Sequence, residues 1–437
     1  MKEPTRRLFV ETYGCQMNKA ESEAIAADLA ADGWERAGNP DEADLVIINT
    51  CSVRETAEDR IRGRLGWYRR LKRRRPFTLL VAGCMAERLG QRALDEYPEI
   101  DALVGTYGRE GLRDAVRRAG AGGRPVVHGD GTFRFAARHS SGGPRAFLPV
   151  MHGCDNFCSY CIVPFVRGSE VSRPASEVLA EVRALDAGGC LDVTLLGQNV
   201  NSYRSAESGP VVTFPRLLER VAASAGRIRW IRFLTSHPKD LSPDLVSVMA
   251  AEPRLCRHVH LPVQSGSDRV LAAMNRGYSA RGYLRLVDAL RDALTGVAIT
   301  TDILTGFPGE TEEDVRRTLE LMERAEFDEA FTYRYNPREG TAAALLGDPV
   351  PEPVKLERLG RIIAAQRGIS RRRAIGRLGA VTEVLVEGVS KREPGELLAR
   401  TEWDEMAVFP GDPSLIGGFV RVRIESLAGA TFRAAIV

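Results

Sequence analysis

The chain has 437 residues, 44 % of them hydrophobic, and a formal net charge of +3. This length predicts two to four domains, because a single core seldom grows beyond ~300 residues. No run approaches the ~20 apolar residues of a membrane span, and the N-terminus MKEPTRRLFVETYGC lacks the apolar core of a signal peptide. We therefore expect a cytoplasmic protein without a membrane segment. Its eight cysteines are interpreted as metal ligands or catalytic groups rather than as members of disulfides.

Residues 1–145 are predicted to form an α/β domain. RLFVETYG, ADLVIINT, FTLLVAG and IDALVGT have the composition of buried strands, and ESEAIAADLAADG has helical periodicity. Such alternation predicts a parallel sheet with helices on both faces. The Gly- and Ser-rich stretch RHSSGGPR, at 138–145, marks the end of this domain.

Residues 146–376 contain a second alternating series. Its candidate strands are AFLPVMHG, DVTLLGQN, RIRWIRFLTS, RHVHLPVQ, VAITTDILTG and EAFTYRYN. Six such units are too few for a closed eight-fold barrel, so we predict an open, partial (βα)6 TIM-like barrel with ligands at the carboxyl ends of its strands. From 377 to 437, short strands separated by Gly, Pro and Asp predict a small all-β barrel.

Two basic tracts point to a polyanionic partner. Residues 60–75 carry nine basic side chains and no acid, and residues 361–377 carry six and no acid. Such tracts are typical of phosphate binding, although a solvated helix face is the alternative. The C-terminal module is acidic, with seven basic and nine acidic residues, among them Glu402, Asp404 and Glu405, which weighs against contact of its surface with a polyanion. The candidate residues for contact with a nucleic acid are Arg69, Arg70, Lys72, Arg73, Arg74, Arg75, Arg371, Arg372, Arg373, Lys391, Arg392 and Arg400.

Six of the eight cysteines fall into two sets of three. Cys15, Cys51 and Cys84 each follow a predicted strand, and the carboxyl ends of parallel strands share one edge of a sheet. The second set, Cys154, Cys158 and Cys161 in CDNFCSYC, follows the first barrel strand. Zinc sites with four cysteines usually contain two CxxC pairs, which neither set resembles. Three thiolates on a four-iron cluster would instead leave one iron open to a substrate.

The two remaining cysteines, Cys190 and Cys256, are interpreted as small buried hydrophobic residues.

The CxxxCxxC spacing of GCDNFCSYC resembles that of the radical S-adenosylmethionine (SAM) enzymes. The motifs TYGCQMNKAESE, NTCSVRETAEDR, GCMAER, LLGQNVNSY, LPVQSGSDRVLAAMNRGY and DILTGFPGETEED extend the resemblance to the methylthiotransferases, whose third domain is a TRAM module. YGCQMN and CSVRE are similar to the branch of that family that modifies tRNA.

The resemblance implies two [4Fe-4S] clusters, one on each set of three cysteines. The cluster on Cys154, Cys158 and Cys161 would bind SAM and cleave it to a 5′-deoxyadenosyl radical, and the auxiliary cluster on the other set would deliver sulfur. The implied reaction is methylthiolation of C2 of N6-isopentenyl (dimethylallyl) adenosine at tRNA position 37, beside the anticodon. SAM (S-adenosyl-L-methionine) would serve as methyl donor and as radical source.

The implied partners are the tRNA anticodon stem-loop, a reductant such as flavodoxin or ferredoxin, and a sulfur donor, and we expect a monomer. The residues assigned to SAM binding are Phe157, Tyr160, Arg167, Arg173, Gln198, Asn199, Gln264 and Asp302. For the two aromatic residues the alternative is packing in the barrel mouth, and for the polar ones hydrogen bonding within loops.

Two alternative functions stay open at this point. One is a sister methylthiotransferase that acts on threonylcarbamoyl-adenosine of tRNA or on a ribosomal protein. The other, from a different class, is an RNA-binding iron–sulfur redox sensor.

Overall fold

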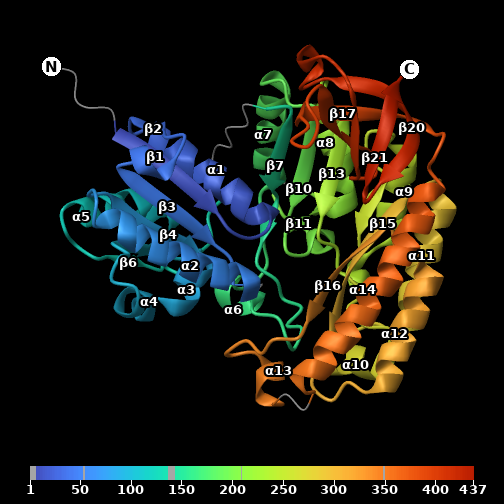
Figure 1. Ribbon diagram of the computed structural model, residues 1–437, viewed down its shortest axis with the longest axis horizontal. Helices are drawn as coiled ribbons and strands as arrows, with labels where there is room; N and C mark the ends of the chain where they lie inside the picture. Colours follow the sequence, from blue (N-terminus) through green and yellow to red (C-terminus); the bar gives the residue numbers. More distant parts are fainter. Residues whose placement is uncertain (1–5, 53–54, 136–142, 208, 348–349) are drawn as a thin grey trace.

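The computed structural model describes residues 6–52, 55–135, 143–207, 209–347 and 350–437. Figure 1 shows an N-terminal α/β part beside a larger barrel, with a small β-barrel at the C-terminal end. Among these described residues, no helix is long and apolar enough to cross a membrane. The stretch predicted to end the first domain, 138–145, lies mostly outside the described residues.

The N-terminal part is a parallel sheet with the strand order β2–β1–β3–β4–β5–β6. The strands are β1 Arg6–Thr12, β2 Trp34–Arg36, β3 Leu45–Thr50, β4 Thr78–Gly83, β5 Ala102–Val104 and β6 Val126–Val127. The helices are α1 Gln16–Ala30, α2 Glu55–Lys72, α3 Cys84–Leu89, α4 Gln91–Glu96 and α5 Leu112–Gly120, with 3-10 turns η1 Pro40–Glu42 and η2 Arg109–Gly111.

Helices cover this sheet on both faces, as predicted. Apolar residues of α1 and α5 form one core with the sheet, and those of α2, α3 and α4 form another. Every residue of β3 is buried as a result. The four strands predicted here are present, and the short edge strands β2 and β6 were missed because few apolar residues mark them.

The central part is the predicted open barrel of parallel strands. The strands are β7 Arg145–Pro149, β10 Asp192–Leu196, β13 Trp230–Leu234, β14 His258–His260, β15 Ala298–Thr305 and β16 Glu329–Arg334. They form two runs, β7–β10–β13 and β14–β15–β16, joined by a parallel bridge between Ile231 and Leu255. In the part of the chain that the structure describes, β7 and β16 do not pair with each other, so the barrel is open.

Helices cover the outside of the barrel and bury one large apolar core (Figure 1). They are α7 Ala175–Ala187, α8 Phe214–Ser224, α9 Pro243–Ala251, α11 Ala280–Ala293, α12 Glu312–Ala325 and α14 Glu352–Ile375. The short helices α6 Val163–Arg167, α10 Asp268–Ala273 and α13 Ala342–Leu345 contribute to smaller apolar clusters. Short elements decorate the loops: β8 Met151–His152, β9 Val171–Ser172, η3 Val200–Ser202, β11 Arg204–Ser205, β12 Val212–Thr213 and η4 Pro238–Asp240.

The C-terminal module is a closed barrel with the strand order β17–β18–β19–β21–β20. Its strands are β17 Val381–Val389, β18 Glu396–Thr401, β19 Met406–Pro410, β20 Phe419–Ala428 and β21 Thr431–Ile436, with the turn η5 Pro413–Leu415. All the strands predicted for this module are present. Closure leaves no free sheet edge and encloses a core of alternating apolar residues.

The acidic stretch at residues 402–405 faces the central barrel. The Arg232 guanidinium donates to the carbonyl of Glu402 at 3.0 Å and lies 3.8 Å from the Asp404 carboxylate. The Glu405 carboxylate accepts a 2.5 Å hydrogen bond from Arg377. Asp404 therefore faces the barrel, and Glu405 pairs with Arg377, whose guanidinium also donates to Asp328 of the barrel at 2.9 Å. These two acids belong to the contact between the C-terminal module and the barrel.

The contact between the C-terminal module and the barrel predicts that the free energy of unfolding depends on pH. Burial raises the pKa of Glu405 to about 7, against the opposing charge of Arg377. The folded protein therefore binds the proton of the Glu405 carboxyl more tightly than the unfolded protein does. The stabilisation that this proton gives the folded protein is fully present below about pH 4.3 and is lost as the pH rises through 7. Between pH 6 and 8 the loss is about 1 kcal/mol.

We expect Glu405→Gln to flatten the fall in thermal midpoint between pH 6 and 8, measured by circular dichroism on the full chain. The exposed Glu425→Gln is the matched control and should leave the slope unchanged. Equal slopes in all three proteins would contradict the role given to Glu405.

Candidate active site

The three N-terminal cysteines converge at one edge of the sheet. Cys15 follows β1 and caps α1, Cys51 follows β3, and Cys84 begins α3 directly after β4. These strands are neighbours, so their carboxyl ends meet. A hydrogen bond with Cys51, aided by the charge of Arg167, lowers the pKa of Cys15 to about 6. The three thiols are thus electrostatically coupled, although 36 and 33 residues separate them in sequence.

Glycines and asparagines of the sequence motifs explain this close approach. A Cβ atom on Gly14 would lie 2.6 Å from the Cβ of Cys51, and φ of Gly14 is +141°, so only glycine fits there. The side chain of Asn18 donates to the carbonyl of Thr50 at 3.0 Å, and that of Asn49 donates to the carbonyl of Asn18 at 2.8 Å. The Asn of YGCQMN therefore ties the start of α1 to the end of β3.

The second cysteine set lies on the loop between β8 and α6. Cys158 is buried, whereas Cys154 and Cys161 are half-buried. Burial, with the neighbouring Cys158 thiol, raises the pKa of Cys161 to about 12 in the absence of a bound group. The loop includes Phe157 in the left-handed region, at φ +45°. The thiols of Cys154 and Cys158 both raise the pKa of Cys161, so the three lie near one another around this turn.

The segment after α10 holds this loop in place. The side chain of Asn275 donates to the carbonyl of Phe157 at 3.0 Å, and the hydroxyl of Ser159 donates to the carbonyl of Ala273 at 2.8 Å. The buried Arg276 donates to the Sγ of Cys158 at 3.3 Å. The sequence analysis missed Asn275 and Arg276, because over a hundred residues separate them from the cysteines they contact.

Both cysteine sets suit a four-iron cluster. All six thiols are free, with no disulfide among the described cysteines. In the described ranges, no three His, Cys, Asp or Glu side chains are close enough to hold a single metal ion. A four-iron cluster binds each thiolate through a different iron, so its ligands stand farther apart than those of one ion. Three free thiols around a common space fit such a cluster, and they do not fit a mononuclear zinc site.

A cavity of about 380 Å³ opens beside the second set, at the carboxyl ends of the barrel strands. Its lining includes Cys161 and three residues predicted to bind SAM, namely Tyr160, Gln264 and Asp302. Tyr160 also packs against the apolar cluster around Phe307. This size and lining suit a nucleoside-sized ligand next to the cysteines.

The other residues predicted to bind SAM lie elsewhere. Phe157 projects outward, with 54 % of its surface exposed. Arg173 is buried against Glu181 of α7, and the side chain of Asn199 donates to Asp240 at 2.7 Å.

Gln198 is half-buried at the end of β10, and its side-chain oxygen has no hydrogen-bond partner among the described residues. Arg167 points to the boundary with the N-terminal part, where its guanidinium donates to Glu21 of α1. The roles assigned to these residues in SAM binding stay predictions.

The two cysteine sets lie on either side of the boundary between the N-terminal part and the barrel. Cys84 packs against Ile162, the residue after Cys161, and against Val166 of α6. In Figure 1, α6 lies where the N-terminal part meets the barrel. Ion pairs between Arg338 and Glu58, at 3.8 Å, also cross this boundary. A substrate bound between the parts would be in reach of both sets.

The predicted RNA-binding residues divide into exposed and paired groups. Lys72, Arg75, Arg372, Arg373 and Arg400 contact acids or carbonyls of the chain itself. The exposed residues are Arg69, Arg70, Arg73, Arg74, Arg371, Lys391 and Arg392.

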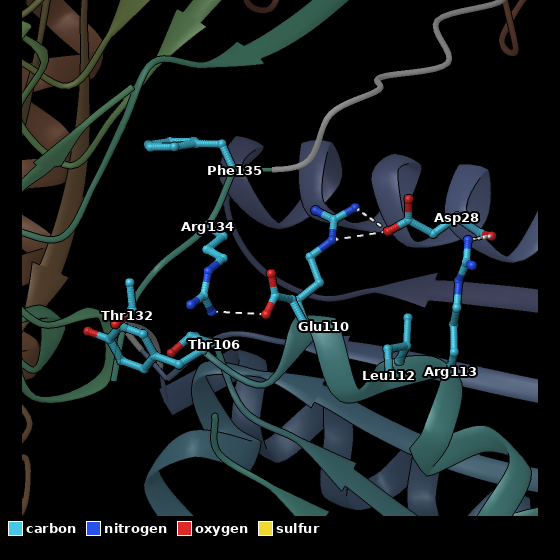
Figure 2. A pocket seen from close by; sticks show the side chains of 10 residues that line it. Asp28, Thr106, Glu110, Leu112, Arg113, Thr132, Arg134 and Phe135 are labelled. Atoms are coloured by element: carbon cyan, nitrogen blue, oxygen red, sulfur yellow. Dashed lines mark hydrogen bonds and ion pairs between the residues drawn. The ribbon is translucent and has the colours of Figure 1, made fainter. Parts of the chain in front are cut away.

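A second cavity, of about 230 Å³, lies in the N-terminal part between α1 and the segment around Phe135 (Figure 2). Arg109 pairs with Asp28 at 2.8 Å, and Arg134 with Glu110 at 2.9 Å, as the dashed lines show. No cysteine is among the described residues that line it. It is therefore distinct from the cavity at the barrel mouth.

Three family descriptions match the three parts of the chain. Residues 7–105 match "Uncharacterized protein family UPF0004", residues 148–322 the radical SAM superfamily, and residues 377–437 the TRAM domain. Among solved structures, the radical SAM methyltransferase TsrM from Kitasatospora setae, with cobalamin and a [4Fe-4S] cluster bound, superposes with a TM-score of 0.59 at 15 % identity. The match covers 78 % of this chain and 77 % of that one, and it supports the fold.

Curated proteins are similar over the full length. The chain is 46 % identical to the tRNA-2-methylthio-N(6)-dimethylallyladenosine synthase of Treponema denticola, over 98 % of this chain and 99 % of that protein. It is 47 % identical to the protein of the same name from Geobacter metallireducens, over 95 % of each.

Proposed function

The chain belongs to the family of tRNA-2-methylthio-N6-dimethylallyladenosine synthases, and we propose on this premise that it transfers a methylthio group to C2 of N6-dimethylallyl adenosine in tRNA. The observation that carries the proposal is the packing of Cys84, from one cysteine set, on Ile162 and Val166, which lie one and five residues after the last cysteine of the other set. One set can serve radical formation, and the other can hold the sulfur to be transferred. The enzyme is a radical SAM transferase with two [4Fe-4S] clusters.

The C–H bond that must be broken in the substrate explains why the reaction needs radical chemistry and a separate source of sulfur. C2 of adenine carries a hydrogen that no side-chain base removes as a proton under mild conditions. When bound, the clusters and SAM supply one-electron chemistry and sulfur. Cys154, Cys158 and Cys161 would hold the SAM cluster, and Cys15, Cys51 and Cys84 the auxiliary one.

The chain's own residues bind and orient the reactants. The cavity lined by Tyr160, Gln264 and Asp302 offers SAM a site beside Cys161. Arg276 donates to Cys158 from a buried position, and so supplies positive charge next to the thiolate ligands. The packing of Cys84 on Ile162 and Val166 shields that thiol from solvent.

The finer partners belong to this proposal as well. The substrate is a tRNA, and the target base lies in the anticodon stem-loop, where unstacked bases can be turned into a site. A flavodoxin- or ferredoxin-like reductant and a separate sulfur donor complete the reaction. We propose that the enzyme acts in the cytoplasm as a monomer.

The exposed arginines at the end of α2 and in the turn that follows it suggest a second contact with tRNA. α2 is 18 residues long and runs from the cysteine edge of the sheet back to the opposite edge. At 1.5 Å per residue its basic end is about 27 Å from Cys51. The arginines 69, 70, 73 and 74 would therefore hold phosphates well away from the modified base.

Replacing these four arginines with alanine should weaken tRNA binding more than Lys391→Ala with Arg392→Ala. Losing four phosphate contacts would reduce the slope of log K against log salt concentration by about 3. Filter binding over a salt series measures both effects. Equal losses in the two variants would count against the contact by α2.

Mass spectrometry of tRNA nucleosides from a deletion strain tests the function. Loss of the 2-methylthio-N6-dimethylallyl adenosine signal, with accumulation of the unmodified N6-dimethylallyl nucleoside, is expected. Restoration by the full-length chain supports the assignment. If the signal persists while a methylthiolated threonylcarbamoyl-adenosine or ribosomal protein disappears, a sister enzyme is the correct identity. A protein that releases no 5′-deoxyadenosine from SAM under reducing conditions would be the redox sensor.

A further inference from the structure

Arg167 occupies the boundary between the two cysteine sets. It ends α6, six residues after Cys161, and only 3 % of its surface is exposed. Its guanidinium donates to both oxygens of Glu21 on α1, at 2.6 and 3.1 Å, and lies 3.3 Å from Nδ1 of His152. A barrel residue is therefore bound, bidentately, by a carboxylate of the N-terminal part.

The guanidinium also faces the N-terminal cysteines. Val166, its neighbour in sequence, packs directly on Cys84. Burial raises the pKa of Cys84, and the positive charge of Arg167 opposes this and also helps to lower the pKa of Cys15. The cysteines of the auxiliary site come from one part of the chain, and this buried cation comes from the other.

The residues around Arg167 are buried, which strengthens the interaction of its charge with neighbouring groups. His152 is fully buried and stacks on Phe133 with ring centroids 3.4 Å apart. Thr106, labelled in Figure 2, donates to the carbonyl of Val166 at 2.6 Å and ties the cavity wall to the turn that carries Arg167. Charges interact more strongly in such an enclosed site than in water.

We propose that Arg167 is a positioning residue of the auxiliary site, whose guanidinium offsets the negative charge of Cys15, Cys51 and Cys84 and sets the reduction potential of the centre they hold. Glu21 limits how much of that positive charge reaches the thiolates. The auxiliary site is then complete only when the barrel is docked on the N-terminal part. This inference rests on the proposed function, because it presumes an iron–sulfur centre on these cysteines.

The test isolates the auxiliary centre. In the full chain, alanine replaces Cys154, Cys158 and Cys161, and the protein is reconstituted anaerobically with iron and sulfide. A mediated redox titration, followed by electron paramagnetic resonance, gives the midpoint potential of one-electron reduction. Arg167→Gln should make the centre harder to reduce. The equilibrium constant for its one-electron reduction should fall at least tenfold, which lowers the midpoint potential by about 59 mV. Arg167→Lys, which keeps the charge, should restore most of the shift.

Glu21→Gln gives the decisive comparison, because removing the carboxylate should shift the potential in the opposite direction, upward. Arg232→Gln is the matched control: that arginine is also buried, but it pairs with Asp192 of the barrel. It should leave the potential unchanged.

Shifts of the same sign for Arg167→Gln and Glu21→Gln would mean that both variants merely disturb packing, and would overturn the proposal. A second outcome would also overturn it: Arg167→Gln leaves the potential unchanged and, introduced into the chain with all its cysteines, abolishes SAM binding. That result would favour the SAM-binding role predicted from the sequence. Normal iron binding in these cases leaves the proposed function intact. If the parent binds no iron at all, the inference and the two-cluster assignment fail together.

Discussion

Cys158→Ala should abolish 5′-deoxyadenosine formation and tRNA methylthiolation together. Cys158 is the buried member of its set and accepts a hydrogen bond from Arg276. Without it, only two thiolates remain to hold the SAM cluster, and Arg276 is left as a buried cation without that partner. The bound iron should fall from about eight to about four per chain. Iron analysis and chromatography of the SAM products after anaerobic reduction measure both losses.

Cys256→Ala is the matched control for this variant. Cys256 is also buried, but it packs with Trp230 and Leu385 between the barrel and the C-terminal module. Its replacement should leave iron content and both products at the parental level. A Cys158→Ala protein that still cleaves SAM, or a Cys256→Ala protein that loses iron, would show that the SAM cluster is held elsewhere.

Cys84→Ala should separate the two activities. Cys84 starts α3 and belongs to the auxiliary set, so its loss removes the sulfur-delivering centre. The SAM site keeps its three thiolates and its cavity, and reductive formation of 5′-deoxyadenosine should continue. The methylthio nucleoside should fall below detection in an assay with N6-dimethylallyl tRNA, and iron should again fall to about four per chain.

The control here is Cys190→Ala, in the core between α7 and β10. It should retain both products. If Cys84→Ala also stops SAM cleavage while its SAM-site iron is retained, the two sites are coupled through the packing of Cys84 on Ile162 and Val166, and the separation of roles is wrong. Methylthiolation that survives in Cys84→Ala would remove the auxiliary set from the reaction.

The sequence alone was sufficient for the main strands and helices and their order. The fold class was predicted and is confirmed, because local patterns of apolar residues encode these elements, whereas the short edge strands β2 and β6 lack such a pattern. Placement of the cysteines also followed from local rules: each N-terminal cysteine ends a strand, and parallel strands bring their carboxyl ends together. Cys190 and Cys256 are buried as predicted.

Charged side chains were harder to interpret from sequence. Glu402, Asp404 and Glu405 weighed against RNA contact by the C-terminal module. In the structure Asp404 lies beside Arg232 of the barrel, and Glu405 pairs with Arg377, which also binds Asp328 of the barrel. Composition reports how many charges a module carries. It does not report which of them face a neighbouring domain.

Only the tertiary structure decided which residues surround the two cysteine sets. Arg276 reaches Cys158 across 118 residues, and Arg167 reaches Glu21 across 146. Arg167, chosen from sequence for its closeness to CDNFCSYC, lies against the other set instead. The apolar pattern that encodes strands and helices repeats over a few residues, so it specifies elements and the edge at which their ends meet. Contacts between elements depend on how helices such as α1, α3 and α6 pack across a domain boundary, and no local pattern carries that information.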